Sequence, residues 1–208
     1  LLDVIRTINA DDAIHGCLLF RPLPKQFDDR TVRAALAPEK DIDGITDGSL
    51  AGVFTNTDLG YAPCTAQACL EILKYYGVPL SGKRAVVVGR SLVVGKPAAM
   101  MLDRENATVT LCNSRTQNLP QVCREADIVV AAMGKMAAVG VDCLRPGQTV
   151  VDVGIHVNEE GRLCGDVQFA AAEPVVDAIT PVPGGVGTVT TSVLVGHVVA
   201  AACKKAGL

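Results

Sequence analysis

The sequence has 208 residues, 49% of them hydrophobic, which is enough apolar surface for the core of one large domain or two small ones. Its 19 basic and 22 acidic residues give a formal charge of −3, and no Lys/Arg-rich run favours a nucleic-acid or anionic-membrane surface. Gly, Pro or charge interrupts every long apolar stretch and no signal-peptide pattern opens the chain, so we expect a cytosolic protein without a membrane span that binds small molecules.

The cysteines contain no C-x-x-C pair, which disfavours a zinc site and a redox dithiol. All of them lie in apolar segments, so we expect reduced thiols, most of which pack as small hydrophobic side chains. The eight are Cys17, Cys64, Cys69, Cys112, Cys123, Cys143, Cys164 and Cys203.

The first third of the chain predicts a short β-α unit followed by a long loop. The opening LLDVIRTIN has no Met and has apolar residues at helical spacing, so we expect the sequence to start inside a helix of a longer parent protein. The apolar run 15–21 predicts a strand, and 28–36 predicts a helix. Residues 38–65 have no sustained period and are expected to form a loop or linker that carries function. A helix over 68–76 follows, stopped by a glycine.

From Lys83 onward, short strands rich in Val and Ile alternate with helices. Because these strands lack polar alternation, they predict a parallel sheet covered on both faces, an α/β fold. The expected elements are a strand at RAVVV, a helix to about Arg104, strands at ATVTLC and DIVVAA with a short helix near Val122 between them, a strand at QTVVDVGI, and helices over about 169–176 and 189–206.

The stretch VVVGRSLVVG predicts a phosphate-binding turn. A strand that enters a glycine and then a helix places free N–H groups at the helix N-terminus, where phosphate is stabilised. The usual G-x-G-x-x-G has a second glycine where this chain has Ser91, whose hydroxyl could donate to a phosphate instead. A plain tight connection between strand and helix remains open as the alternative.

The end of the next strand favours NADP over NAD. NAD-binding proteins carry an acid there for the ribose hydroxyls, whereas this chain reads Cys112-Asn113-Ser114-Arg115. Arg90, Ser114 and Arg115 are therefore expected to accommodate a 2′-phosphate.

Four further stretches are candidate ligand sites. Gly134 and Gly154 follow predicted strands, where open α/β sheets bind ligands, so they are candidates for the nicotinamide end. Ordinary turn glycines are the alternative at both positions. The Pro- and Gly-rich stretch 179–191 allows backbone to approach a flat ligand, or is a stiff loop between domains. EKDIDG, residues 39–44, offers two carboxylates that would point the same way on an extended chain, one of which could accept from a heterocycle's N–H groups. Solvated loop acids are the alternative.

The histidines do not form a catalytic set. His15 begins an apolar segment and His197 lies in a predicted helix, so only His156 is expected near the site.

Several stretches together resemble the bifunctional methylenetetrahydrofolate dehydrogenase/cyclohydrolases. HGCLLFRPLPKQFDD, PEKDIDG, APCTAQACLEIL, VVVGRSLVVGKP, ENATVTLCNSRT, VVDVGI and ITPVPGGVGTVT match family segments in order along the chain. The resemblance implies NAD(P)-dependent oxidation of 5,10-methylenetetrahydrofolate to the methenyl form, often followed by hydrolysis to 10-formyltetrahydrofolate, in a two-domain homodimer of one-carbon metabolism. It also implies a G-x-S cofactor turn in place of G-x-G.

The resemblance also implies domains and site residues. Residues 1–65 with 190–208 match the folate-binding catalytic domain, and 66–189 match a Rossmann NAD(P)-binding domain. Asp43 matches the carboxylate that binds the pterin, and Pro183 and Gly184 match folate-lining backbone. The residues that match the cofactor site are Gly89, Arg90, Ser91, Val94, Gly95 and Ser114 at the adenosine and phosphate end, and Thr65, Ile155, Gly187 and Thr190 nearer the nicotinamide, where Gly134 is also placed.

The sequence departs from the family at several positions. The family's Tyr-x-x-x-Lys pair, whose lysine serves the cyclohydrolase step, is absent from these 208 residues. Phe20 stands where the family has Gln, so we expect weak or altered hydrolysis. Arg21, Ala66 and Thr188-Val189 also differ. A monofunctional dehydrogenase and a catalytically inactive module that binds NADP or folate remain as alternatives.

Overall fold

The Val-rich segments of the chain form a five-stranded parallel sheet. In the computed structural model, which describes residues 1–208, the strand order is β2-β1-β3-β4-β7. The strands are β1 (Arg84–Val88), β2 (Thr108–Cys112), β3 (Ile128–Ala131), β4 (Thr149–Asp152) and β7 (Ala178–Ile179). β1, β3 and β4 are almost wholly buried, which explains the consecutive apolar residues at their centres.

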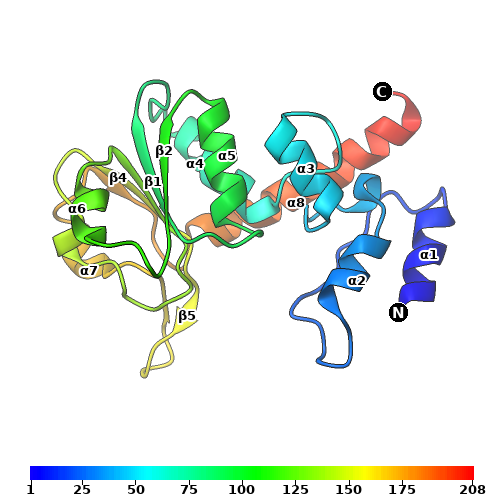
Figure 1. Ribbon diagram of the computed structural model, residues 1–208, viewed down its shortest axis with the longest axis horizontal. Helices are drawn as coiled ribbons and strands as arrows, with labels where there is room; N and C mark the ends of the chain where they lie inside the picture. Colours follow the sequence, from blue (N-terminus) through cyan, green and yellow to red (C-terminus); the bar gives the residue numbers. More distant parts are fainter. The chain divides into compact units, whose positions relative to one another are not determined.

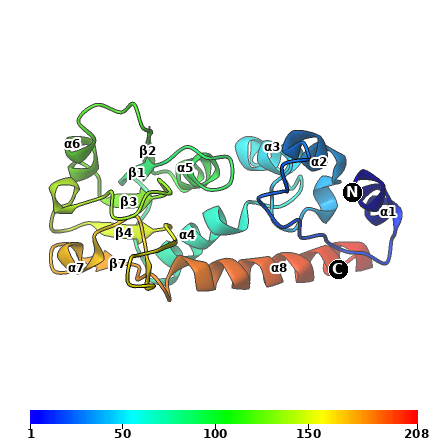
Figure 2. The ribbon, with the colours of Figure 1, turned by 90° about the horizontal axis from the view of Figure 1, so that it is seen from below.

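Helices cover both faces of this sheet, so the predicted α/β fold is confirmed (Figures 1 and 2). In Figure 2, α4 and α5 lie on one face, and α6 and α7 lie on the other. The elements are α4 (Cys64–Tyr75), α5 (Gly95–Arg104), α6 (Leu119–Arg124), the 3-10 helix η2 (Val141–Cys143), the hairpin of β5 (His156–Val157) with β6 (Leu163–Cys164), and α7 (Phe169–Ala172). Helix α7 ends four residues before the predicted helix end at 176.

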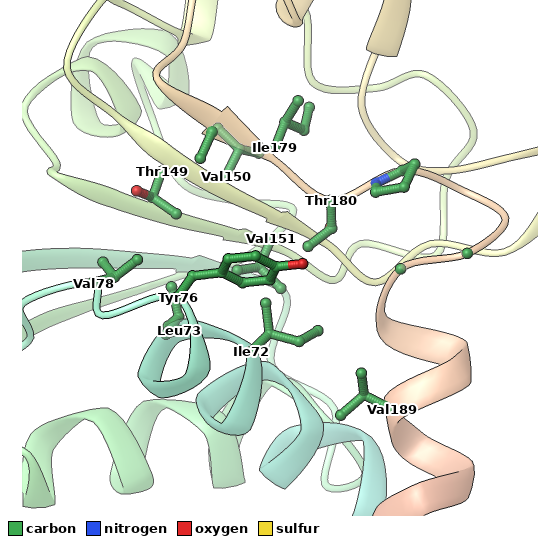
Figure 3. A pocket seen from close by; sticks show the side chains of 14 residues that line it. Ile72, Leu73, Tyr76, Val78, Thr149, Val150, Val151, Ile179, Thr180 and Val189 are labelled. Atoms are coloured by element: carbon green, nitrogen blue, oxygen red, sulfur yellow. The ribbon is translucent and has the colours of Figure 1, made fainter.

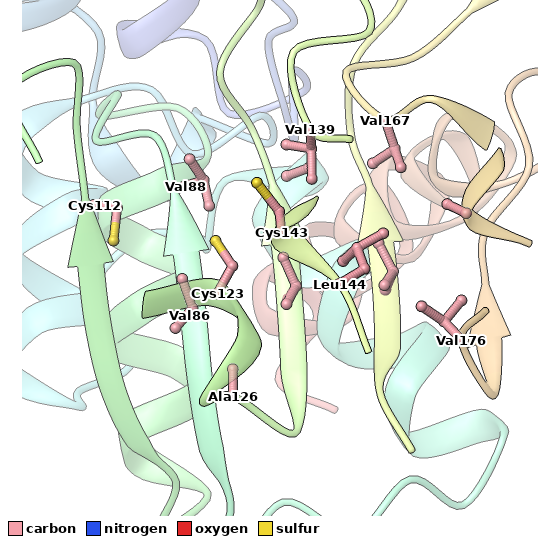
Figure 4. Close-up of a cluster of buried hydrophobic side chains, with 14 residues drawn as sticks. Val86, Val88, Cys112, Cys123, Ala126, Val139, Cys143, Leu144, Val167 and Val176 are labelled. Carbon is pink, nitrogen blue, oxygen red and sulfur yellow. The ribbon is translucent and has the colours of Figure 1, made fainter. Parts of the chain in front are cut away.

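A cluster of small side chains fills the core on the α6 side of the sheet (Figure 4). Val86 and Val88 of β1 pack there with three cysteines that contribute apolar volume. All cysteines of the chain are free, as predicted, and five of the eight are buried.

The chain divides into two units. The first unit comprises Leu1–Cys64 and Thr191–Leu208, and the second unit comprises Thr65–Thr190, which contains the sheet.

The first unit is built from helices. They are α1 (Leu2–Ala10), α2 (Asp29–Ala35), the 3-10 helix η1 (Pro38–Lys40), α3 (Asp47–Thr55) and the part of α8 (Val186–Ala206) that follows Thr190. Ile5, Val32 and Leu36 form one apolar cluster between α1 and α2. A second cluster joins Ile42 and Tyr61 to α8 through Ala201.

Two predictions for the first unit were wrong. The run 15–21 makes only a single bridge, from Cys17 to Asp41, because Asp41 lies between η1 and the turn at residues 42 and 43 and no longer partner strand is present. The predicted loop 38–65 contains α3, whose start is capped by the Thr46 hydroxyl accepting from the Ser49 N–H at 3.1 Å. Two glycines within α3 obscure its apolar period.

Helix α8 also differs from prediction. It begins at Val186, three residues earlier than expected, and has 21 residues. By length and composition alone it is apolar enough to cross a membrane, so the expectation that no segment reaches that length was wrong. One such helix is weak evidence for a membrane, because core helices of soluble proteins share this length and composition.

A buried lysine joins two elements of the first unit. Lys40 is 8% exposed, and its Nζ donates to the backbone carbonyls of Ile8 and Asp11 at the C-terminal end of α1. An ammonium group at a helix C-terminus satisfies carbonyls that have no partner within the helix.

Lys40→Met should therefore lower the free energy of unfolding by about 2 kcal/mol, because two carbonyls at the end of α1 lose a charged donor. Urea denaturation measures this value. Lys25→Met, at an exposed position, is the matched control and should change stability little. Equal stability of the two variants would show that the Lys40 contacts contribute nothing.

Candidate functional site

Two positions in the turn after β1 accept only glycine, because neighbouring backbone leaves no room for a Cβ atom. Gly89 has φ +129°, and a Cβ there would lie 1.9 Å from the carbonyl oxygen of Ala132. A Cβ on Gly95 would lie 1.9 Å from the carbonyl oxygen of Gly89. Backbone therefore lines the turn of residues 89–94 between β1 and α5.

Ser91 organises the start of α5. Its Oγ accepts from the N–H groups of Val94 at 3.1 Å and Gly95 at 3.4 Å. The hydroxyl proton remains free to donate, and the peptide N–H groups of Arg90 and Ser91 have no acceptor within the protein. This donor set fits a pyrophosphate at the helix N-terminus.

Arg90 and Ser114 lie at neighbouring strand ends. Val88 of β1 is in register with Cys112 of β2, so the residues that follow each strand begin side by side. Both Arg90 and Ser114 are exposed, and Asn113 tightens the second turn by accepting from the Arg115 N–H at 3.0 Å. With no acid in this turn, the pair fits a ribose 2′-phosphate.

Two buried carboxylates hold the loops that follow β3 and β4. Asp166 accepts from three successive N–H groups, those of Met133 at 2.5 Å, Gly134 at 3.0 Å and Lys135 at 2.9 Å, and it contacts His156 Nε2 at 2.8 Å. Because Asp166 already binds the Gly134 N–H, Gly134 can meet a cofactor only through its other atoms. The sequence alone gave no sign of this role for Asp166.

Asp152 is the second carboxylate. It accepts from the N–H groups of Gly154 at 3.0 Å, Asp166 at 2.9 Å and Val167 at 2.9 Å. Burial raises the pKa of Asp152 above its usual value, while these three donors oppose that shift. Asp152 and Asp166 together fix the backbone at the carboxyl ends of β3 and β4.

The Pro- and Gly-rich stretch lines a small cavity in the second unit. The cavity has a volume of about 160 Å³ and brings Gly154 and Ile155 together with Pro183, Gly184 and Gly187. Four of these were predicted site residues, and Gly154 was a predicted candidate for the nicotinamide end. Thr65, Val94 and Thr190 do not line this cavity: Thr65 lies in the first turn of α4, Val94 precedes α5, and the Thr190 hydroxyl donates to Val186 O within α8.

A larger apolar cavity, of about 350 Å³, lies beside α4 (Figure 3). The Tyr76 ring extends from the end of α4 across it, and β4 and β7 form its other wall. Gly184 is the only predicted site residue that lines it.

In the first unit, the two aspartates of EKDIDG have different environments. Asp41 is fully buried and accepts from the Ile45 N–H at 3.1 Å, the Thr46 N–H at 2.7 Å and the Ser49 hydroxyl at 2.7 Å. The expectation that both carboxylates point the same way on an extended chain was wrong, because residues 42 and 43 form a turn. Asp41 is used inside the fold, which leaves Asp43 for a ligand.

The Asp43 carboxylate is half-buried. Burial raises its pKa above the usual value, the Cys64 thiol that hydrogen-bonds it lowers the pKa, and Asp41 raises it further. Arg21 and His197 add smaller opposing effects. A partly desolvated carboxylate is suited to accept hydrogen bonds from a heterocycle. His197 near Asp43 was missed because the two lie far apart in sequence.

Phe20 is 82% exposed, so its ring adds nothing to the core. The adjacent Arg21 donates from Nε to Asp29 at 2.8 Å, which holds the arginine side chain on α2.

Family models match both parts of the chain. The model of the NAD(P)-binding domain of tetrahydrofolate dehydrogenase/cyclohydrolase matches residues 63–206, and the model of the catalytic domain of the same family matches residues 1–43. The chain belongs to the tetrahydrofolate dehydrogenase/cyclohydrolase family. The resemblance inferred from the sequence is thus confirmed.

Individual relatives agree with this family assignment. The bifunctional protein FolD of Carboxydothermus hydrogenoformans is 58% identical over 93% of this chain and 68% of the relative. The FolD of Alkaliphilus oremlandii is 50% identical over 96% of this chain and 70% of the relative.

Solved structures of the family share the fold. The FolD methylenetetrahydrofolate dehydrogenase/cyclohydrolase of Campylobacter jejuni superposes with a TM-score of 0.95 at 36% identity, over 98% of this chain and 72% of that chain. The Trypanosoma brucei enzyme, solved with NADP cofactor and an inhibitor, gives a TM-score of 0.89 at 35% identity, over 96% of this chain and 70% of that chain.

The role of Asp166 in this family member can be tested with Asp166→Asn. An amide has one acceptor oxygen and brings an NH₂ group toward backbone N–H donors, so the loop after β3 should open. We expect the free energy of unfolding to fall by about 3 kcal/mol and the Kd for NADP⁺ to rise, as measured by denaturation and calorimetry. Asp103→Asn, on the exposed face of α5, is the control. Wild-type values for both quantities in Asp166→Asn would contradict this role.

Proposed function

We propose that this protein oxidises 5,10-methylenetetrahydrofolate to 5,10-methenyltetrahydrofolate with NADP⁺, as an oxidoreductase of one-carbon metabolism. One combination of features carries the proposal. This member of the family has a G-R-S turn with no acid to bind the ribose, and it also has the half-buried Asp43.

NADP⁺ supplies the hydride acceptor, and the second unit binds it. The glycine turn and its N–H groups hold the pyrophosphate, Arg90 and Ser114 hold the 2′-phosphate, and the loops fixed by Asp152 and Asp166 line the nicotinamide end. The proposed cofactor residues are Gly89, Arg90, Ser91, Val94, Gly95, Ser114, Gly134, Ile155 and Gly187, with Thr65 and Thr190 as the remaining family positions.

Asp43 binds the pterin, and the backbone of Pro183 and Gly184 lines the folate. Loss of hydride from the methylene carbon leaves a cationic amidinium product, which a fixed carboxylate stabilises. When it is ionised, the same carboxylate accepts pterin N–H groups with both of its oxygens. The first unit thus acts as the folate-binding catalytic domain.

Hydrolysis to 10-formyltetrahydrofolate is the second activity of the family. We propose that it depends on the family lysine, which these 208 residues do not contain, and that Phe20 in place of Gln weakens it. A hydroxyl or amide at that position can hydrogen-bond a neighbouring lysine, whereas a phenyl ring cannot. Robust hydrolysis of methenyltetrahydrofolate by a parent protein containing both the lysine and Phe20 would refute the effect of Phe20.

We also propose that the protein acts in the cytoplasm as a homodimer, on small molecules and without a nucleic-acid or membrane partner. The charge of −3 and the absence of a basic run support this proposal. Sedimentation equilibrium tests the dimer.

NADPH absorbance after mixing the protein with NADP⁺ and 5,10-methylenetetrahydrofolate tests the dehydrogenase directly. Substrate-dependent NADPH is expected. Binding of NADP⁺ or tetrahydrofolate without NADPH formation would instead indicate the inactive binding module.

Asp43→Asn should separate function from stability. We expect kcat/KM for the folate to fall about 100-fold, because the charge-assisted hydrogen bonds are lost. Since burial raises the pKa of Asp43 in the folded state, the wild-type protein loses stability as pH rises through the range between the unfolded and folded pKa values. The variant should therefore be at least as stable as the wild type at neutral pH. Unfolding of Asp43→Asn at neutral pH would show that the carboxylate is structural.

Arg90→Ala should raise the Kd for NADP⁺ about tenfold and leave the Kd for NAD⁺ unchanged, because only NADP⁺ carries the 2′-phosphate. Calorimetry measures both constants, with Arg104→Ala at the end of α5 as the control. An equal loss for both cofactors would show that Arg90 does not read the 2′-phosphate.

A further inference from the structure

His197 connects α8 to the loop that carries Asp43. Its side chain is buried, at 7% exposure, and its Nδ1 lies 2.8 Å from the carbonyl oxygen of Ile42. A carbonyl oxygen only accepts, so Nδ1 carries a proton and donates it to Ile42. This bond spans 155 residues of sequence within the first unit.

Cys64 contacts the same loop. Its Sγ lies 3.3 Å from the Ile42 carbonyl oxygen and 3.5 Å from His197 Nδ1, and its backbone N–H donates to the Asp43 carbonyl oxygen at 3.4 Å. Because the Nδ1 proton points at Ile42, that nitrogen cannot accept the thiol proton. The thiol therefore donates to Ile42 or to the Asp43 carboxylate, with which it also hydrogen-bonds.

The Cys64 thiol is a donor and not a nucleophile. Burial, with Asp43 nearby, raises its pKa to about 12, so the thiol keeps its proton. Removal of that proton would place a thiolate beside a carboxylate.

Packing fixes the plane of the His197 ring. The Tyr61 ring lies against it with centroids 5.0 Å apart, and Lys204 Nζ lies 4.9 Å from the centroid of the Tyr61 ring. Gly44 follows Asp43 with φ +69°, and a Cβ there would lie 2.5 Å from the backbone of Ala62 and Pro63. The loop thus has little room to move on this side.

We propose that His197 is a positioning residue for Asp43: its Nδ1–H, together with the Cys64 thiol, fixes the turn so that the carboxylate faces the amino and ring N–H donors of a pterin. This inference rests on the proposed function, because it takes Asp43 as the group that binds the substrate. His197 itself touches the loop backbone and not the reacting carbon.

Two substitutions isolate the Nδ1–H donor. His197→Phe keeps an aromatic ring against Tyr61 and removes the donor, whereas His197→Asn retains an N–H donor at a similar distance from the backbone. We expect His197→Phe to raise the KM for 5,10-methylenetetrahydrofolate about tenfold, with the KM for NADP⁺ unchanged, and His197→Asn to restore the folate KM to within about threefold of wild type.

Amide hydrogen exchange of residues 41–44 provides a readout that does not depend on turnover. Exchange should accelerate in His197→Phe and return toward the wild-type rate in His197→Asn. A wild-type folate KM together with unchanged exchange in His197→Phe would overturn the inference. If the wild-type protein forms no NADPH, the proposed function fails, and the exchange rates alone then decide whether His197 positions the turn.

Discussion

The loops at the carboxyl ends of β3 and β4 depend on the hydrogen bonds of Asp152 and Asp166. Backbone N–H groups beyond the strand ends have no partner in the sheet, and a buried donor without an acceptor is costly. Asp166 accepts from three such groups after β3, and Asp152 accepts from Gly154 and from the backbone of Asp166 and Val167. Each carboxylate lies against a glycine. A Cβ on Gly154 would collide with Asp166, and a Cβ on Gly165 would collide with Asp152.

The charged residues of EKDIDG also differ in whether they satisfy backbone groups of the fold. Lys40 satisfies carbonyls at the end of α1, and Asp41 satisfies N–H groups at the start of α3. Glu39 is exposed to solvent, and Asp43 keeps a partly exposed carboxylate. The contacts of Lys40 and Asp41 and the hydrogen bond from His197 to Ile42 all hold this turn. A ligand therefore meets a carboxylate whose backbone is already fixed, which reduces the ordering cost of binding.

The sequence predicted well those elements whose signal is local. The β1 strand and its glycine turn follow from an apolar run and a helix start, and the missing acid after β2 can be read directly from Asn113 and Ser114. Helix α3 was missed because two glycines obscure its apolar period, and the strand at 15–21 was wrong because its partner is a single residue. Asp41 and Asp43 could not be told apart from sequence, since their difference lies in contacts with Thr46, Ser49 and Cys64. The contact of His197 with Ile42 joins distant parts of the chain and leaves no local pattern.

Direct hydride transfer from the folate to NADP⁺ is the central claim, and isotopic labelling tests it most directly. The protein would be mixed with NADP⁺ and 5,10-methylenetetrahydrofolate in which both hydrogens of the methylene carbon are deuterium, and the reduced cofactor analysed by mass spectrometry. The account predicts that every NADPH formed carries one deuterium. Unlabelled NADPH, or binding of both ligands without any reduced cofactor, would contradict it.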